Sequence, residues 1–289
     1  MSYLKTKFSI FTVLKFIYLA ALVTICLYPF LHVLAISLSS LPNVIRNKVN
    51  LIPKGFTLIA YEYVFKNPRI YRSYFNTIEL VVLGTLISLT ITAMGAFALS
   101  QKRMLWHSFF TWMLIIPMFF DGGLIPTYLT VRGYGLLDSI WAIILPYTVN
   151  IMNLIILRTF FSSLPYELQE AAKMDGLSDI GIFFRIIIPL SKAGLAAIGL
   201  FYAVAYWNTY VAPMIYLTSD KKFPLQLVLR QMLILDENFA GDVSSMGSAV
   251  ADTALKYATI IVALIPIVAV YPFLQKYFVK GVMLGSIKG

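Results

Sequence analysis

The sequence predicts an all-α polytopic membrane protein. The 289 residues are 60% hydrophobic and only 12% charged, and the mean hydropathy is +0.81. A soluble domain of this length has about 25% charged residues. The apolar stretches are continuous rather than alternating, which indicates membrane helices and not a membrane β-barrel.

Six stretches are long enough to cross a bilayer, which takes about 20 apolar residues each. The first is longer than a signal-peptide core and has no convincing cleavage site, so we expect an uncleaved span. We expect a single membrane domain over residues 1–289. The predicted spans are residues 13–37, 76–99, 106–130, 138–161, 193–217 and 255–278, with a polar connection at 162–192.

The net charge of +10 does not indicate nucleic-acid binding in such a chain. Basic residues commonly flank membrane spans and contact anionic lipid headgroups, and we expect that here. Of the 23 Lys and Arg residues, 12 fall on one predicted side and 11 on the other, so charge does not orient the chain. The lone Cys26 excludes an internal disulfide, and no metal site is expected.

The connection at 162–192 is unusually polar for a segment between two spans. Pro165 suits the first turn of a helix, and Gly176 suits a left-handed helix end. Ser178 is a plausible N-cap for a second helix. The residues therefore predict a helix–turn–helix with a polar surface, either solvated at the membrane surface or docked in a soluble partner.

In this connection Glu170-Ala171-Ala172 is followed after three residues by Gly176, and after nine more by Ile186-Ile187-Ile188-Pro189. This spacing resembles the EAA loop of ABC-importer permeases, EAA-x3-G-x9-I-x-LP. Departures are small: Ile188 stands for Leu, Leu177 for a common Ala, and Ala193 for a frequent second Pro. Residues 120–146, 153–165, 201–213 and 281–289 also resemble the carbohydrate-uptake branch, including the smaller maltose-importer permease and complex-oligosaccharide permeases.

The resemblance implies that the loop is cytoplasmic and couples the permease to an ATPase. The protein would then lie in the bacterial inner or plasma membrane with both termini in the cytoplasm. Glu170 would pair with a basic ATPase residue, Ala171 and Ala172 would allow close approach, and Gly176 would form the turn. An acid commonly precedes that glycine, as Asp175 does here. The tail residues expected at the ATPase interface are Gly285, Ser286 and Lys288.

The same resemblance implies four kinds of partner: a second permease forming a heterodimer, two ATP-binding subunits, an extracellular or periplasmic solute-binding protein, and membrane lipid. ATP and Mg would belong to the ATP-binding subunits, and this chain would carry no cofactor. The sequence itself contains no G-x-x-x-x-G-K-[ST], H-E-x-x-H or G-x-S-x-G pattern. We therefore expect a subunit that is not an enzyme.

Polar and aromatic residues inside the predicted spans are candidates for the translocation path, because such groups usually face a cavity or another helix. Amides can hydrogen-bond sugar hydroxyls, and aromatic faces can stack on sugar rings. Each residue could equally bond a neighbouring helix or anchor the membrane interface. The candidates are Asn150, Asn153, Tyr206, Trp207 and Asn208.

Two other functions compete with the importer hypothesis. A stand-alone secondary transporter or channel would need ionisable groups in its spans or an inverted repeat, yet the acids expected inside the spans, Glu79 and Asp121, both lie near ends. A membrane-anchored enzyme is disfavoured by the missing motifs. Basic residues in the predicted outer segments suggest an oligosaccharide that could be acidic and contain uronate, although lipid or a binding protein could equally meet these charges.

Overall fold

The fold is that of a computed structural model, which describes residues 10–101, 104–120, 122–234 and 254–269. Within these ranges the regular structure is helical, apart from one isolated antiparallel bridge between Ser39 and Phe56. The described residues form two compact units. One holds 10–67, 232–234 and 254–265, and the other holds the described parts of 68–231 together with 266–269.

The first unit begins with α1 (Ile10–Ser37), an apolar helix of 28 residues with Pro29 inside it. Most of its side chains are exposed, as suits a helix whose solvent is lipid. The short helices α2 (Leu41–Ile45) and α3 (Ile59–Lys66) follow. A small apolar cluster closes this unit around the end of α1, made by Ala35, Ile36, Val44 and Val49 with Tyr257 of the apolar helix Ala254–Ala269.

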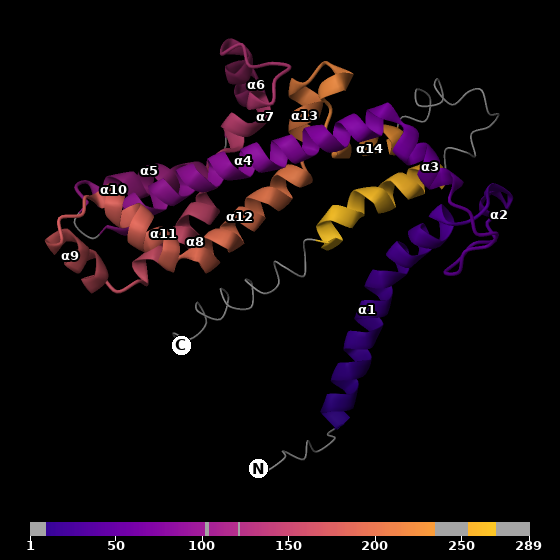
Figure 1. The fold of residues 1–289 in the computed structure, drawn as a ribbon, viewed down its shortest axis with the longest axis horizontal. Helices are drawn as coiled ribbons and strands as arrows, with labels where there is room; N and C mark the ends of the chain where they lie inside the picture. Colours follow the sequence, from indigo (N-terminus) through magenta and orange to yellow (C-terminus); the bar gives the residue numbers. More distant parts are fainter. Residues whose placement is uncertain (1–9, 102–103, 121, 235–253, 270–289) are drawn as a thin grey trace. The chain divides into compact units, whose positions relative to one another are not determined.

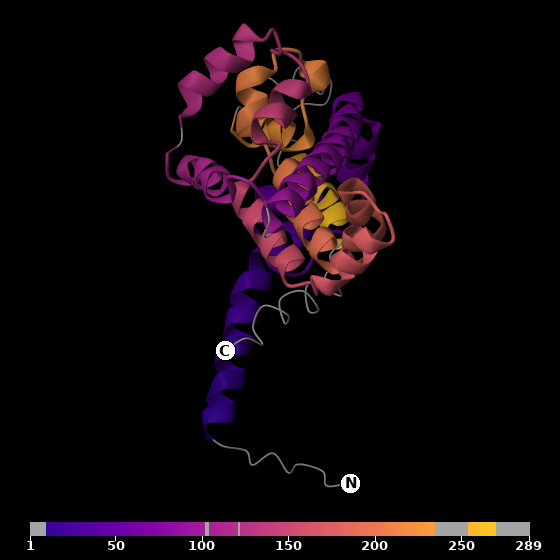
Figure 2. The ribbon, with the colours of Figure 1, turned by 90° about the vertical axis from the view of Figure 1, so that its left-hand side faces the viewer.

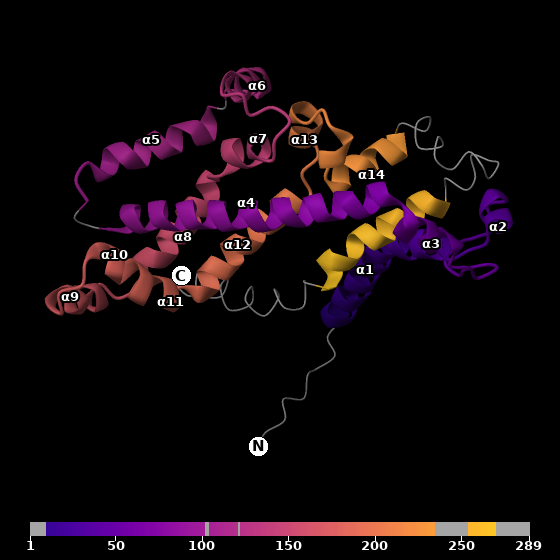
Figure 3. The ribbon, with the colours of Figure 1, turned by 45° about the horizontal axis from the view of Figure 1, so that its top comes forward.

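The second unit is organised around α4 (Pro68–Ser100), a helix of 33 residues that is about 50 Å long at 1.5 Å per residue. It packs against α8 (Ile151–Ser162) and α12 (Lys192–Trp207), as Figures 1 and 3 show. The buried face of α4 carries small and polar residues that recur near every fourth position, which lets helix backbones approach closely. This face contains Ser73, Thr77, Leu80, Gly84, Ser88, Thr92 and Ala96.

Helices α5 (His107–Phe119) and α6 (Leu124–Gly133) arch away from the rest of the second unit (Figure 2). No described residue of α5 is buried, although its sequence is strongly apolar. Such a surface is compatible with lipid or a protein partner and not with water.

The remaining helices of this unit are short. Helix α7 (Trp141–Ile144) runs into a 3-10 turn, Leu145–Tyr147, and α8 starts again after a bend of 54°. The turn contains Pro146, which interrupts helical hydrogen bonding. Helices α13 (Val211–Tyr216) and α14 (Leu225–Ile234) follow α12, joined by a 3-10 turn, Asp220–Lys222.

The predicted polar connection forms α9 (Glu167–Met174), α10 (Asp179–Ile182), a π-helical turn at Phe183–Ile187 and α11 (Ile188–Leu190). The predicted turn and cap are confirmed: Gly176 has φ +80°, and the Ser178 hydroxyl accepts a hydrogen bond from the Gly181 N–H at 3.3 Å. The chain then bends by 85° into α12. The second unit therefore presents a helix–turn–helix at one end of α4.

By length and composition, α1 and α4 are each able to cross a membrane, and up to five spans result if each bent helix pair counts as one. The chain is thus an all-helical polytopic protein. The helix Ala254–Ala269 is shorter than a span, and the remainder of the predicted sixth span, residues 270–278, lies outside the described residues. A count of six spans stays a prediction.

Candidate functional site

The first candidate site is the outer surface of α9. Glu170 and Ala171 are exposed on it, and Met174 is 88% exposed. Gln169 and Ala172 instead face inward, and both are buried. The helix therefore turns Gln169 and Ala172 toward the protein body and leaves Ala171 and Met174 outside.

Leu164, Leu168 and Ala171 have the i, i+4, i+7 spacing of an apolar helix stripe, although Leu164 lies before the start of α9. In the structure Leu168 and Ala171 are exposed, and none of the ion pairs among the described residues involves Glu170. An exposed apolar patch rimmed by polar residues is typical of a protein contact surface.

The turn after α9 is held by backbone and side-chain contacts. Asp175 ends the helix, and its N–H donates to the Ala171 carbonyl at 3.0 Å. Lys173 reaches across the turn to Asp179, with 2.9 Å between Nζ and Oδ1. A β-carbon added to Gly176 would meet nothing within 4 Å, so the glycine is required here by its positive φ and not by crowding.

The inner side of α9 meets the end of α4 through polar groups. The Gln101 amide donates to Gln169 Oε1 at 3.1 Å, and Arg158 Nε donates to the Leu99 carbonyl at 3.0 Å. Arg158 Nη2 also lies 3.2 Å from His107 Nε2. These groups line a cavity of about 450 Å³, and we call the set Leu99, Gln101, His107, Arg158 and Gln169 the polar junction.

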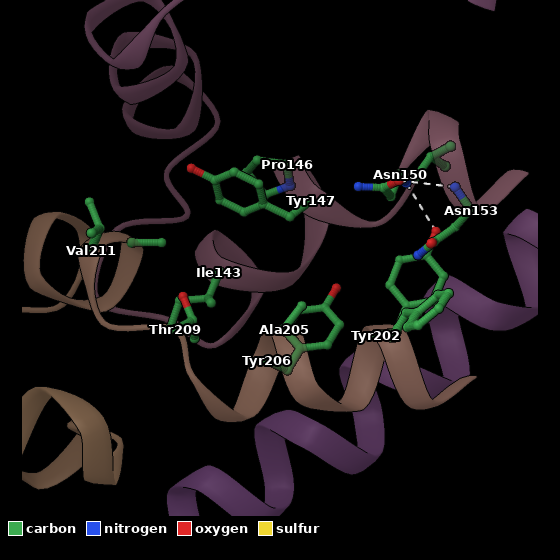
Figure 4. Close-up of a pocket in the computed structure, with 13 residues that line it drawn as sticks. Ile143, Pro146, Tyr147, Asn150, Asn153, Tyr202, Ala205, Tyr206, Thr209 and Val211 are labelled. Carbon is green, nitrogen blue, oxygen red and sulfur yellow. Dashed lines mark hydrogen bonds between the residues drawn. The ribbon is translucent and has the colours of Figure 1, made fainter. Parts of the chain in front are cut away.

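The second candidate site is a pocket of about 480 Å³ between α7, the start of α8, the end of α12 and α13 (Figure 4). Three of the predicted path residues, Asn150, Asn153 and Tyr206, line it. Amide and phenol groups on such a wall supply both donors and acceptors, and the tyrosine rings supply apolar faces. The pocket can therefore hold a polar molecule that also has apolar faces, as a sugar does.

Asn150 has a structural role beside its place on the pocket wall. Its side-chain oxygen accepts a hydrogen bond from the Asn153 N–H at 3.0 Å and so caps the N-terminus of α8. This cap is why α8 begins afresh after the bend.

Sequence analysis missed Tyr202, which joins three elements at this pocket. Its hydroxyl lies 2.6 Å from Thr92 Oγ1 on α4 and accepts from the Asn150 N–H at 2.9 Å. One turn further along α12, the Tyr206 hydroxyl lies 2.8 Å from Ser88 Oγ. The four-residue spacing of both pairs, Tyr202–Tyr206 and Ser88–Thr92, is the signal that could have predicted these contacts.

The other two predicted path residues lie elsewhere. Trp207 is buried, and its ring packs edge-on against Tyr74 of α4 with centroids 6.2 Å apart. Its indole N–H has no hydrogen-bond partner within the described residues. Asn208 is exposed and donates to the Val204 carbonyl of its own helix at 2.9 Å. Neither lines the pocket.

Glu79 lines a separate cavity of about 320 Å³ with Asn76, Asp138 and Lys222. Lys222 Nζ lies 2.7 Å from Asp138 Oδ2, and the N–H groups of Thr218 and Ser219 donate to Oδ1 at 3.0 Å each. The Lys222 hydrogen bond, assisted by the two backbone donors, lowers the pKa of Asp138 to about 2. Asp138 therefore ties the segment after α13 to the start of α7.

The other sequence predictions cannot be placed in the same way. Asp121 and the tail residues Gly285, Ser286 and Lys288 lie outside the described residues. Over the described ranges, no group of three or more His, Cys, Asp or Glu residues is arranged to hold a metal ion.

Residues 8–284 match the family described as "Binding-protein-dependent transport system inner membrane component", and the chain belongs to this family. It is the membrane-spanning permease of an ABC importer, a multi-pass inner-membrane protein and the non-catalytic subunit, with ATP hydrolysis on a separate protein. Such a system also implies a second permease and a binding protein as partners. Family membership excludes the stand-alone transporter and the membrane-anchored enzyme.

Two curated relatives come from Bacillus subtilis (strain 168). The chain is 44% identical to the "Polygalacturonan/rhamnogalacturonan transport system permease protein YtcP", over 98% of this chain and 100% of the relative. It is 43% identical to "Protein LplC", over 97% and 95%. Among solved structures, it resembles a chain of a bacterial ABC transporter involved in the import of the acidic polysaccharide alginate. That match has a TM-score of 0.89 and 33% identity, and covers 96% of this chain and 100% of the other.

Proposed function

We propose that this permease carries an acidic, uronate-containing oligosaccharide across the membrane, driven by ATPases that dock on α9. The observation that carries the coupling half of the proposal is the exposed surface of α9, with Glu170 and Ala171 facing outward and a glycine-enforced turn behind them. Ala171 has no bulk to hold a partner away, and the Glu170 carboxylate is available to a basic residue of the ATPase.

The proposed topology follows from this docking. Because the ATPases act in the cytoplasm, α9 lies on that side, and a chain with six spans then has both termini there. The tail residues Gly285, Ser286 and Lys288 would reach the ATPase interface. The chain would form a single membrane domain and pair with a second, different permease. Two ATP-binding subunits and an external solute-binding protein would complete the complex.

The proposed path runs through the pocket lined by Asn150, Asn153 and Tyr206. Closure of the docked ATPases would move α9 and alternate the access of this pocket between the two sides of the membrane. Trp207 and Asn208, which lie away from the pocket, are proposed to border the path only in a conformation other than this one.

The acidic substrate is supported by two relatives whose names specify a polymer, polygalacturonan/rhamnogalacturonan and alginate. Lys and Arg residues of the proposed outer segments, such as Lys221 and Arg230, would attract an anionic sugar rather than repel it. The neutral maltose type of substrate is the alternative within the same family.

Copurification tests the docking. We expect the ATPase and the second permease to copurify with the tagged wild-type chain, and the ATPase to be lost from the combined variant Glu170→Ala with Gly176→Pro. The exposed Glu167→Gln is the matched control on the same helix, and it should keep the ATPase. A combined variant that retains the ATPase as well as the control does would refute docking on α9.

Uptake tests the substrate. We expect oligogalacturonates to compete with a labelled oligogalacturonate in whole cells far better than neutral maltooligosaccharides of equal length. Equal or stronger competition by the neutral sugars would reject an acidic substrate and leave the docking proposal untouched.

A further inference from the structure

The polar junction lies where α4 ends, where α5 begins and where α9 turns inward. The Leu99 carbonyl belongs to the last turn of α4, so it has no partner within the helix. Arg158 supplies a donor to it, and a cation is favoured at the negative end of a helix dipole. The end of the longest helix of this unit is therefore held by a side chain from α8.

The Leu99 carbonyl and the Arg158 guanidinium both lie next to His107 Nε2, at 3.0 Å and at 3.2 Å from Nη2. With a proton on Nε2 the imidazole donates to the carbonyl, and with a lone pair there it accepts from the guanidinium, which carries only donors. In both tautomers Arg158 Nε donates to the Leu99 carbonyl. Arg158 thus joins the C-terminal end of α4 to the first residue of α5.

Gln169 makes the corresponding connection to α9. It is 6% exposed, although Leu168, Ala171 and Met174 of the same helix are exposed. Its amide oxygen accepts from Gln101, directly beyond the end of α4. Gln101 is half-buried, and its bond to the buried Gln169 is directional because a hydrogen bond forms only over a narrow range of distance and angle.

We propose that the polar junction is the internal link through which movement of α9 reaches the pocket, with Gln101, Arg158 and Gln169 as positioning residues. This inference rests on the proposed docking of ATPases on α9. Through the junction α9 is attached to α4, and α4 holds the pocket tyrosines of α12 through Ser88 and Thr92. A continuous helix of 33 residues can carry a displacement between these two places.

Replacing both Gln101 and Gln169 by leucine distinguishes a positioning role of this pair from simple packing. Replacing both glutamines by apolar residues of similar shape removes the directional bond but leaves no buried polar group unpaired, so stability should stay near that of the wild type. A single Gln101→Leu substitution leaves the buried Gln169 amide oxygen without this partner and should lower the thermal midpoint. A purely structural junction would therefore be repaired in the double variant, and a positioning junction would not.

The experiment measures how ATP changes access to the pocket, and it needs no sugar. Cys26 is the single cysteine of the chain, so Thr209→Cys in a Cys26→Ser background places one reactive thiol on the pocket wall. The purified complex is treated with a membrane-impermeant thiol reagent, with and without ATP and vanadate. The readout is the ratio of the two labelling rates for this chain.

We expect a clear ATP-dependent change with the intact junction. Gln101→Leu combined with Gln169→Leu should reduce that change about fivefold, the factor that corresponds to one hydrogen bond of ~1 kcal/mol. Arg158→Gln should reduce it similarly, and Arg158→Lys, which keeps a cationic donor, should lose less. Thr159→Val is the matched control, because among the described residues its exposed hydroxyl bonds the Ile155 carbonyl of its own helix and no other group.

A double leucine variant that keeps the full ATP-dependent change would overturn the proposal, as would an intact junction that shows no change with ATP. A double leucine variant that has the thermal midpoint of the wild type but a reduced ATP-dependent change in labelling supports the proposal. Failure of the docking proposal is visible separately, because the Glu170→Ala complex would then retain its ATPase while the junction variants are measured.

Discussion

Substitution of Gly84 tests how α4 and α12 are held together. A β-carbon built on Gly84 would lie 2.7 Å from Cε2 of Tyr206, whereas ordinary contacts begin at 3.4 Å. In Gly84→Ala the ring must therefore move by about 0.7 Å or more, into a helix interface that is already packed. That movement also strains the 2.8 Å hydrogen bond between Tyr206 and Ser88.

The expected destabilisation can be worked out from opposing terms. Overpacking of a helix contact costs about 1–3 kcal/mol. Loss of the Tyr206 hydrogen bond adds ~1 kcal/mol. Replacing a helical glycine by alanine gains about 1 kcal/mol of helix propensity. The net effect of Gly84→Ala is a loss of about 1–3 kcal/mol.

Gly199→Ala is the matched control, since Gly199 lies on α12 and its added β-carbon would meet only Leu89 Cδ2 at 3.4 Å. This variant gains the same propensity without a clash and should be neutral or more stable. The assay is the thermal midpoint of the purified complex in detergent, with transport measured alongside because Tyr206 lines the pocket. If Gly84→Ala unfolds at the same temperature as Gly199→Ala, the close packing described here is wrong.

Three further predictions concern the turn, the pocket and the outer ion pair. Gly176→Ala should weaken ATPase copurification about fivefold or more, because a left-handed alanine costs about 1–2 kcal/mol, and Gly133→Ala, with equally open space and no positive φ, should not. Tyr202→Phe should lower the thermal midpoint and transport, since Thr92 and the Asn150 N–H lose a shared partner; unchanged values for both would contradict its bridging role. The pKa of Asp138 is lowered to about 2 in the folded protein, so its ionised carboxylate stabilises the fold. This stabilisation is fully present above the unfolded-state pKa of about 3.9 and is lost as the pH falls toward about 2. Asp138→Asn should flatten the fall of the thermal midpoint over that window, and an equally steep fall would refute the assignment.

Local sequence signals predicted the turn at Gly176 and the cap at Ser178. Both depend on backbone preferences that act over a few residues, so a single sequence is enough to read them. The inward orientation of Gln169 was not predictable in this way. An apolar stripe normally faces a protein core, and only the position of Gln101 beyond the end of α4 gives the buried amide its partner.

The candidates for the translocation path were also predicted only in part from the sequence. Apolar spans with isolated amides and aromatic residues identified a set of five candidates, but only Asn150, Asn153 and Tyr206 meet at one pocket. Which side of a helix faces the pocket depends on its rotation against its neighbours, and that rotation is set by contacts such as Gly84 against Tyr206. Composition and motif spacing alone determined a helical membrane protein with an EAA-type loop. The tertiary structure decided which polar groups meet, because a residue's partner across α4, α8 and α12 lies 50 to 120 positions away along the chain.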